Sequence, residues 1–241
     1  MYDYGEACPV SKASSLLCER WTLQIIREML LGATRFSALQ RQLPKISPSL
    51  LNARLRVLVD SGIAIRKRIP EQRGFEYHLT PAGQALQPVI NEMGKWGMRW
   101  VFSGLPDDEL DAVVLLGHMA ALLKTEELPV CDTVFQFTFT DLAEPAQYFI
   151  LLHEGRREVC DINPGHEVDV FIRATLRTVS EIFWGERDLA DVRKEGSLQI
   201  LGAPVYERSV AKWFPVSSLV GERRQARIDR SSGRLPGPVG C

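Results

Sequence analysis

Residues 35–62 read RFSALQRQLPKISPSLLNARLRVLVDSG, and the fold of the N-terminal half follows from this stretch. Apolar side chains recur at helical spacing in its first nine residues, and Pro44 ends that pattern. A second, longer helix is expected to begin at Ser47-Pro48. A serine side chain accepts hydrogen bonds from the free N–H groups of a first turn, and proline is tolerated there. Gly62 is a candidate for the left-handed residue that ends this helix.

One helix is predicted before this pair and a β-hairpin after it. Residues 20–31 place their apolar side chains on one helical face. Residues 63–69 and 75–79 alternate apolar and polar side chains with period two, and a Pro/Gly-containing turn separates them. A further helix is expected from Thr80-Pro81 to Trp100. This order of elements is typical of a winged helix-turn-helix, whose third helix enters the DNA major groove.

The face of the third helix opposite Leu51, Leu55 and Leu58 carries side chains suited to base edges. Asparagine can bond adenine bidentately, arginine can bond guanine, and serine can bond either. The hairpin carries a basic run suited to phosphates. The candidate DNA-binding residues are Arg35, Ser47, Ser49, Asn52, Arg54, Arg56, Arg66, Lys67, Arg68 and Arg73. For Arg54 two roles stay open, a phosphate contact or a brace to a buried carboxylate such as Glu28.

The chain has a net charge of −1, but this charge is distributed unequally between the two halves. Residues 1–104 hold 14 Lys and Arg against 8 Asp and Glu, a net charge of +6. Residues 105–220 hold 10 against 20, a net charge of −10. We therefore predict a basic DNA-binding domain in residues 1–104 and an acidic domain in residues 105–220. Residues 221–241 are rich in Arg, Ser, Gly and Pro, which predicts a disordered basic tail.

The acidic half predicts an α+β domain, because strands come first and helices follow. Residues 134–140 alternate strictly, and residues 148–153, 158–162 and 168–172 are further candidate strands. Helices are expected afterwards, at residues 174–184, 189–194 and 204–214.

The N-terminal hundred residues resemble the HxlR-type winged helix-turn-helix regulators. The resemblance rests on Cys8-Pro9-Val10, Arg20-Trp21-Thr22, Arg35-Phe36-Ser37-Ala38-Leu39, Ile46-Ser47-Pro48, Leu51, Arg54-Leu55, Leu58, Gly62-Ile63, Tyr77-His78-Leu79-Thr80-Pro81-Ala82-Gly83 and Leu86. It implies a homodimer that reads a palindromic operator in double-stranded DNA. It also implies that helices near residues 9–19 and 81–100 form the dimer interface, where Trp96, Met98 and Trp100 would suit.

Residues 108–216 resemble the sterol carrier protein type 2 fold, through Val168-Asp169-Val170, Trp184-Gly185-Glu186, residues 195–202 and Trp213-Phe214. This resemblance implies a five-stranded, mostly antiparallel sheet with helices packed on it and an apolar tunnel for a hydrophobic small molecule. The candidate ligand-binding residues are Phe149, Ile172, Phe183, Trp184 and Trp213. The alternative is that these side chains simply fill the core.

The sequence gives no sign of an enzyme, a metal site or a bound cofactor. It contains no GxSxG, P-loop, HExxH or GxGxxG motif, and its four histidines are isolated. The five cysteines are scattered and odd in number, and residues 1–10 lack the pattern of a signal peptide, so we expect a cytoplasmic protein without a membrane segment. Cys8 is a candidate redox or electrophile sensor, and a buried cysteine in the dimer interface is its alternative.

Together these patterns predict a ligand-responsive transcriptional regulator, with an apolar effector in the acidic domain. Two other interpretations stay open. One is a carrier of hydrophobic ligands whose N-terminal domain mainly dimerises. The other is a thiol-based regulator that uses Cys8.

Overall fold

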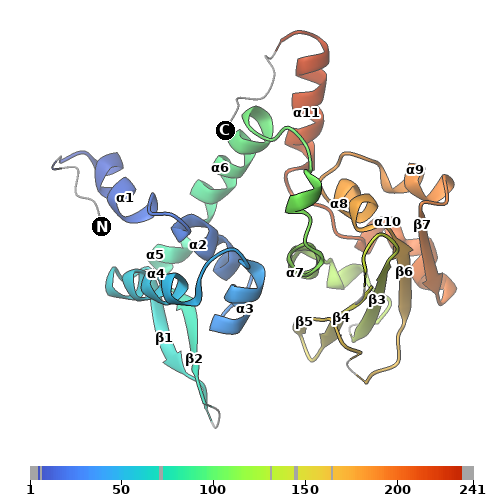
Figure 1. Ribbon diagram of the computed structural model, residues 1–241, viewed down its shortest axis with the longest axis horizontal. Coiled ribbons are helices and arrows are strands. Elements are labelled where there is room, and N and C mark those ends of the chain that lie inside the picture. The colour runs from blue at the N-terminus through green and yellow to red at the C-terminus, as the bar shows by residue number, and fades with distance from the viewer. Residues whose placement is uncertain are drawn as a thin grey trace. The chain divides into compact units, whose positions relative to one another are not determined.

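The computed structural model describes residue 5 and residues 7–70, 73–130, 132–143, 146–163 and 165–234. The chain divides into two compact units, Met1–Met93 and Gly94–Cys241. The elements of the first unit follow the order expected for a winged helix-turn-helix (Figure 1). They are α1 (Pro9–Leu17), α2 (Thr22–Leu30), α3 (Phe36–Gln42), α4 (Pro48–Asp60), β1 (Ala64–Arg68), β2 (Phe75–Leu79), α5 (Pro81–Gln84) and α6 (Gln87–Trp100), which continues into the second unit.

Helix α4 begins and ends as its sequence predicts. The hydroxyl of Ser47 accepts a hydrogen bond from the N–H of Leu50, Pro48 occupies the first turn, and Gly62 has a φ of +73° after the last turn. Its buried side chains join those of α2, α3 and the hairpin in one core. That core contains Ile25, Ile26, Met29, Leu39, Leu43, Ile46, Leu51, Leu55, Leu58, Ile63, Ala64 and Tyr77.

Thr80 and Gly83 attach helix α5 to the end of α4. The hydroxyl of Thr80 donates to the carbonyl oxygens of Gly62 and Ile63, at 2.7 and 3.1 Å, and accepts from the N–H of Gly83. A Cβ on Gly83 would lie 2.3 Å from the carbonyl oxygen of Ile63, so only glycine allows this approach of the backbones. The helix predicted from Thr80-Pro81 to Trp100 is therefore present as two, α5 and α6.

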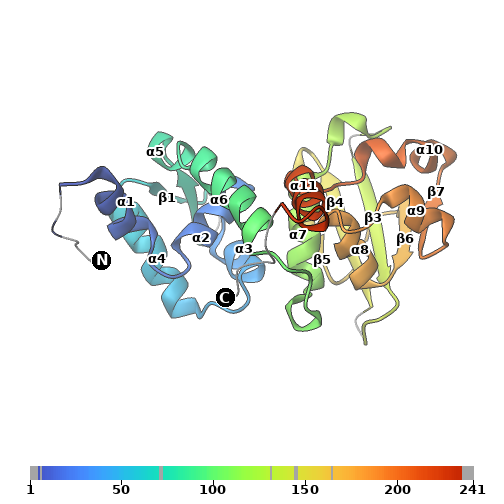
Figure 2. The same cartoon turned by 90° about the horizontal axis from the view of Figure 1, so that it is seen from above.

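The second unit contains a five-stranded sheet with helices that pack on one of its faces (Figure 2). Its elements are η1 (Asp107–Glu109), α7 (Ala112–Leu122), η2 (Thr125–Glu127), β3 (Thr133–Phe139), β4 (Gln147–His153), β5 (Arg156–Cys160), β6 (Val170–Ala174), α8 (Leu176–Phe183), α9 (Leu189–Lys194), β7 (Leu198–Gly202), α10 (Pro204–Trp213) and α11 (Val220–Ser231). The strand order is β5-β4-β3-β6-β7. The sheet is mixed, because β3 and β6 are parallel while the other three pairs are antiparallel.

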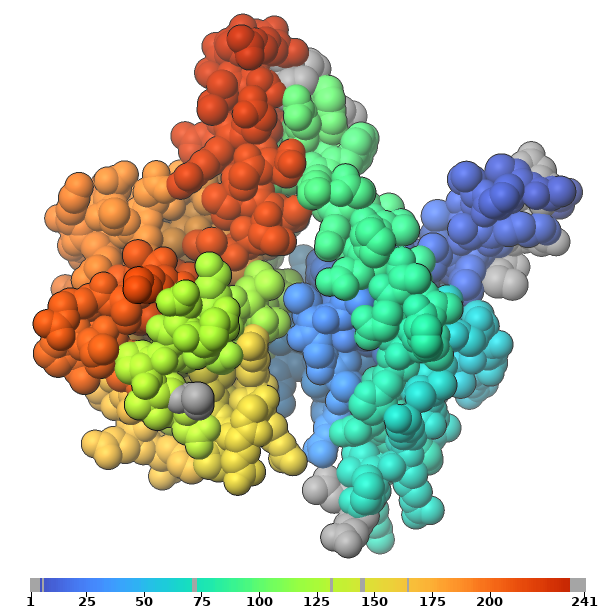
Figure 3. Space-filling model, turned by 180° about the vertical axis from the view of Figure 1, so that it is seen from behind, coloured from blue at the N-terminus to red at the C-terminus, as the bar shows by residue number. Residues whose placement is uncertain are grey.

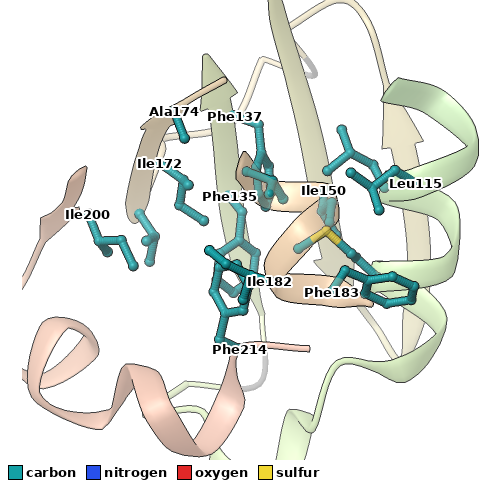
Figure 4. Close-up of a cluster of buried hydrophobic side chains, with 14 of the residues drawn as sticks. Leu115, Phe135, Phe137, Ile150, Ile172, Ala174, Ile182, Phe183, Ile200 and Phe214 are labelled. Atoms are coloured by element: carbon teal, nitrogen blue, oxygen red, sulfur yellow. The ribbon is translucent and has the colours of Figure 1, made fainter. Parts of the chain in front are cut away.

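One face of this sheet forms the main core of the second unit. Phe135, Phe137 and Ile172 lie on it, and Figure 4 shows Leu115 of α7 and Phe183 of α8 packed against the same side. The opposite face is only partly covered, since Phe171 and Leu201 are 43% and 61% exposed.

The structure contains elements that the sequence patterns did not indicate. Helix α7 and strand β7 were not among the segments expected from periodicity, although a fifth strand was implied by the resemblance to sterol carrier protein type 2. The division between units also falls at Met93 and Gly94, whereas the sequence places it after residue 104. The end of α6 belongs to the second unit because it packs with α11: the hydrogen-bond partner of Arg99 is Asp229.

The predicted disordered tail requires a correction. Val220–Ser231 form helix α11, in which Arg223, Ala226 and Asp229 are buried. The prediction relied on the scarcity of apolar residues, whereas this helix packs through buried ion pairs of Arg223 and Asp229. Residues 235–241 of that tail lie outside the described residues.

The close approach at Gly83 makes a prediction for stability. We expect Gly83→Ala to lower the free energy of unfolding of the first unit by about 1–3 kcal/mol, as for other overpacked sites. Gly97→Ala is the matched control, because a Cβ on this helical glycine meets nothing within 4 Å and should be neutral or slightly stabilising. Scanning calorimetry of both variants measures the difference. Equal thermal stability of the two variants would contradict the packing role of Gly83.

Candidate nucleic-acid interface

Helix α4 presents a polar face to solvent on the side away from the core. Ser49, Asn52 and Arg56 are exposed, while Leu51 and Leu55 between them are fully buried. Ser47 is also exposed, and its hydroxyl lies 3.2 Å from that of Ser49 at the helix N-terminus. An exposed helix N-terminus with free N–H groups is suited to a phosphate. The arrangement places possible base contacts and a possible backbone contact on one helix.

The β1–β2 hairpin divides its basic residues between two faces. Arg66 and Arg68 lie opposite Tyr77 and Phe75 on one face, and the guanidinium of Arg66 stacks 3.4 Å from the centre of the Phe75 ring. Lys67 lies on the other face, opposite Glu76. All three cations and Arg73 are exposed, so each can reach a polyanion. The sequence predicted one basic cluster here, whereas the structure separates Lys67 from the two arginines.

Arg35 joins the helical part of the first unit to the hairpin. It precedes helix α3, forms an isolated β-bridge with Glu76, and its Nε lies 3.6 Å from a Glu76 carboxylate oxygen. Glu76 also pairs with His78 at 3.2 Å. The guanidinium of Arg35 remains half-exposed, so a contact with DNA is compatible with this position.

Arg54 is held within the protein and points toward the start of α2. Its Nη2 donates to Glu19 at 2.9 Å and its Nε donates to the carbonyl oxygen of Arg20 at 3.0 Å. The carboxylate partner is therefore Glu19, and the expected candidate Glu28 is instead 2.5 Å from Arg27. The carbonyl of Arg20 precedes Trp21, a non-glycine residue with a φ of +76°. Arg54 thus fixes the backbone at a strained turn that sequence alone did not reveal.

Cys8 is exposed immediately before helix α1. Hydrogen bonds from the backbone N–H groups of Ser11 and Val10, and from the Ser11 hydroxyl, lower the pKa of its thiol. Free N–H groups at a helix N-terminus commonly have this effect on the pKa of a cysteine. The alternative role of Cys8, burial in a dimer interface, stays a prediction, because its exposure in a single chain does not test it.

Helix α6 carries exposed apolar side chains on one side. Val89, Met93 and Trp96 are spaced by four and three residues, and they are 48%, 52% and 57% exposed. We call these three residues the α6 stripe. Of the other residues expected in a dimer interface, Trp100 is half-buried and Met98 is buried within the single chain.

The candidate ligand residues of the second unit do not share one site. Ile172, Phe183 and Trp213 are buried in its main core, and Trp184 packs against that core from its margin. Phe149 is also buried, but it pairs with Gln136 on the opposite face of the sheet. A single ligand on the helix-covered face could contact the first four residues and not Phe149.

Within the described part of the chain, no group of three or more His, Cys, Asp or Glu is placed to hold a metal ion. No helix there has both the length and the apolar composition that crossing a membrane requires.

Comparison with known proteins agrees with the winged helix-turn-helix geometry. Residues 16–104 match the family model of the HxlR-like helix-turn-helix. The uncharacterized HTH-type transcriptional regulator YvaP of Bacillus subtilis is 39% identical over 101 residues, which cover 41% of this chain and 94% of that protein. A second such regulator, sll1512 of Synechocystis, is 36% identical over 42% of this chain and 75% of its own length.

Two solved structures also resemble the chain. The reduced transcriptional regulator YodB of B. subtilis is 34% identical, with coverage of 42% of this chain and 100% of YodB and a TM-score of 0.37. The redox regulator HypR in its reduced form is 30% identical, with coverage of 37% and 90% and a TM-score of 0.36. Both relatives in sequence are named as HTH-type transcriptional regulators. The chain belongs to the HxlR-like helix-turn-helix family of transcriptional regulators.

Proposed function

We propose that this regulator binds double-stranded DNA as a homodimer, with α4 in the major groove and the β1–β2 hairpin on the sugar-phosphate backbone. The observation that carries the proposal is the polar face of α4, where Asn52 and Arg56 are exposed while Leu51 and Leu55 are buried in the core. Asn52 is suited to an adenine, Arg56 to a guanine and Ser49 to either. Ser47 and the N-terminus of α4 are suited to a phosphate.

The basic residues around α4 have different roles in this proposal. Arg66, Arg68 and Arg73 bind phosphates, and Lys67 contributes less because Glu76 lies opposite it. Arg35 contacts a phosphate beside the hairpin. Arg54 acts indirectly, because its bonds to Glu19 and Arg20 hold α4 in place.

The α6 stripe supports the homodimer. An exposed row of three large apolar side chains on one helix is a common mark of a protein–protein interface. Two copies joined through this row would present two α4 helices to a palindromic operator.

For the second unit we propose a sensory role with an apolar small-molecule effector. Its five-stranded sheet, covered on one face by helices, agrees with the architecture that the resemblance to sterol carrier protein type 2 implies. The side chains available to an effector on that face are Ile172, Phe183, Trp184 and Trp213. The acidic charge of residues 105–220 disfavours contact with DNA, which leaves this unit free for another partner.

Substitution of the α4 face tests the base contacts. We expect Asn52→Ala and Arg56→Ala each to weaken binding to a selected operator about 10- to 100-fold, since a bidentate base contact contributes about 1–3 kcal/mol of discrimination. Affinity for unrelated DNA should change little. Fluorescence anisotropy with an operator found by in vitro selection measures both affinities. Arg208→Ala on α10 is the control, because this exposed arginine lies in the second unit; equal losses in all three variants would exclude the assignment.

Salt dependence tests the backbone contacts. We expect the double variant Arg66→Ala/Arg68→Ala to bind every DNA sequence more weakly. The slope of log K against log salt concentration should become shallower by about 1.8, or about 0.9 for each lost phosphate contact. Lys67→Ala is the matched control on the other face of β1. If the slope changes more in Lys67→Ala than in the double variant, the opposite face of the hairpin contacts the DNA.

Native mass spectrometry tests the dimer and the effector together. We expect freshly purified protein to give a dimer, and a fraction of it to carry an additional small mass that organic solvent extracts. Met93→Glu/Trp96→Glu should give monomers, because two charges replace exposed apolar side chains of the α6 stripe. A dimer that persists in this variant would place the interface elsewhere, and a ligand-free spectrum would favour a second unit without an effector.

Thiol sensing is a second candidate function, and the lowered pKa of the exposed Cys8 favours it. A lower pKa leaves more thiolate at a given pH below the ordinary pKa, so alkylation of Cys8 should reach its half-maximal rate at a lower pH than a free cysteine. Iodoacetamide labelling against pH, read by peptide mass spectrometry, measures this profile. Cys18→Ser should retain the alkylation at low pH, and Cys8→Ser should lose it. If Cys8→Ser keeps a full response of DNA binding to oxidant, thiol sensing through this residue is excluded.

A further inference from the structure

Helix α11 packs along the last turns of α6, although more than a hundred residues separate them in the chain. Figures 1, 2 and 3 show the two helices side by side in each view. A Cβ on Gly94 of α6 would lie 3.3 Å from Leu219, immediately before α11. At the other end of the contact, Arg230 donates to the carbonyl oxygen of Arg99 at 2.5 Å. The family match ends at residue 104, so α11 lies outside the part of the chain that the family model describes.

A buried ion pair fixes one side of this contact. Nη2 of Arg99 on α6 lies 2.9 Å from Oδ2 of Asp229 on α11, and the Asp229 side chain is only 7% exposed. Gln225 donates to the other carboxylate oxygen at 3.0 Å. Asp229 is therefore a buried charge with two side-chain partners, and removal of Arg99 leaves this carboxylate without its cation.

A second buried ion pair joins α11 to the turn after α8. Arg223 is 6% exposed and donates from Nη2 to Glu186 at 2.8 Å and from Nη1 to the carbonyl oxygen of Phe102 at 3.1 Å. Its guanidinium also stacks 4.6 Å from the centre of the Phe102 ring. The Phe102 ring lies 6.0 Å from that of Trp184, which in turn meets the core residue Phe183 edge-on at 5.0 Å.

A glycine in the turn after α8 allows the close approach of α11. Gly185 has a φ of +74°, and a Cβ there would lie 2.7 Å from Val220, the first residue of α11. Continuous contacts therefore lead from Phe183 in the core of the second unit, through Trp184 and Phe102, to the end of α6.

We infer that α11 is a brace for helix α6, in which Arg223 and Asp229 are positioning residues. They hold the last two turns of α6, and this fixes the angle at which the α6 stripe meets a second copy of the chain. The inference rests on the proposed homodimer. It also connects the second unit to that dimer. Trp184 contacts Phe102, which follows α6, and Glu186 binds Arg223, which donates to the Phe102 carbonyl oxygen.

The test compares two adjacent arginines of α11 in the full-length protein. Arg223→Ala removes a buried guanidinium. Arg224→Ala removes an exposed one, whose ion pair with Asp188 involves side chains that are 59% and 60% exposed. Hydrogen–deuterium exchange of residues 94–102 reports the state of α6 directly, and sedimentation velocity reports the dimer. The exchange of strand β3 serves as the internal reference for a folded second unit.

We expect Arg223→Ala and Asp229→Ala to accelerate exchange in residues 94–102 at least tenfold, to leave β3 unchanged, and to raise the dimer dissociation constant at least tenfold. Arg224→Ala should match the wild type in all three measurements. The charge-reversed pair Arg99→Asp/Asp229→Arg should recover most of the dimer affinity that Asp229→Ala loses, which a general loss of stability would not allow.

The results separate this inference from the proposed function. A wild-type protein that is monomeric at all concentrations would overturn the dimer, while the exchange of residues 94–102 would still decide whether α11 braces α6. Unchanged exchange in Arg223→Ala, or faster exchange with an unaltered dimer dissociation constant, would overturn the inference and leave the DNA-binding proposal intact.

Discussion

The hydrogen bonds of Thr80 to the carbonyl oxygens of Gly62 and Ile63 close the DNA-binding unit. They join the end of α4 to the start of α5 across the whole hairpin, so the position of the hairpin relative to α4 depends on them. The approach requires a glycine at position 83, because any Cβ there would meet the Ile63 carbonyl. One hydroxyl and one missing side chain therefore hold the segment after the hairpin close to the end of α4.

The first unit could be predicted from the sequence because its signals are local. Caps such as Ser47 and Gly62 depend on the side chain and conformation of single residues, and the apolar stripe of α4 has a clear helical period. The partner of Arg54 could not be predicted in the same way. Glu19 is 35 residues away in the chain, and only the packing of α2 against α4 decides that it, and not Glu28, is in reach.

The second unit was less predictable for two opposite reasons. Helix α7 is apolar on nearly all sides, so it shows no period that distinguishes a buried face from an exposed one. Helix α11 is so polar that its composition resembles a disordered segment, yet its buried face consists of Arg223, Ala226 and Asp229. Phe149 shows the same difficulty in a strand. Both faces of β4 are apolar, and the alternation alone does not assign that residue to the main core or to the opposite face.

The order of α6 and α11 in the chain has a consequence for biosynthesis. Chains emerge from the ribosome N-terminus first, and domains generally fold as units while synthesis continues. The DNA-binding unit can therefore complete its core when residues up to Met93 have emerged, long before Arg223 and Asp229 exist. The contacts of the end of α6 with α11 form only after these residues emerge, so a nascent chain contains a folded first unit whose α6 still lacks α11. Synthesis that stops before residue 220 would give a chain with the core of the first unit complete and α6 without its contacts with α11.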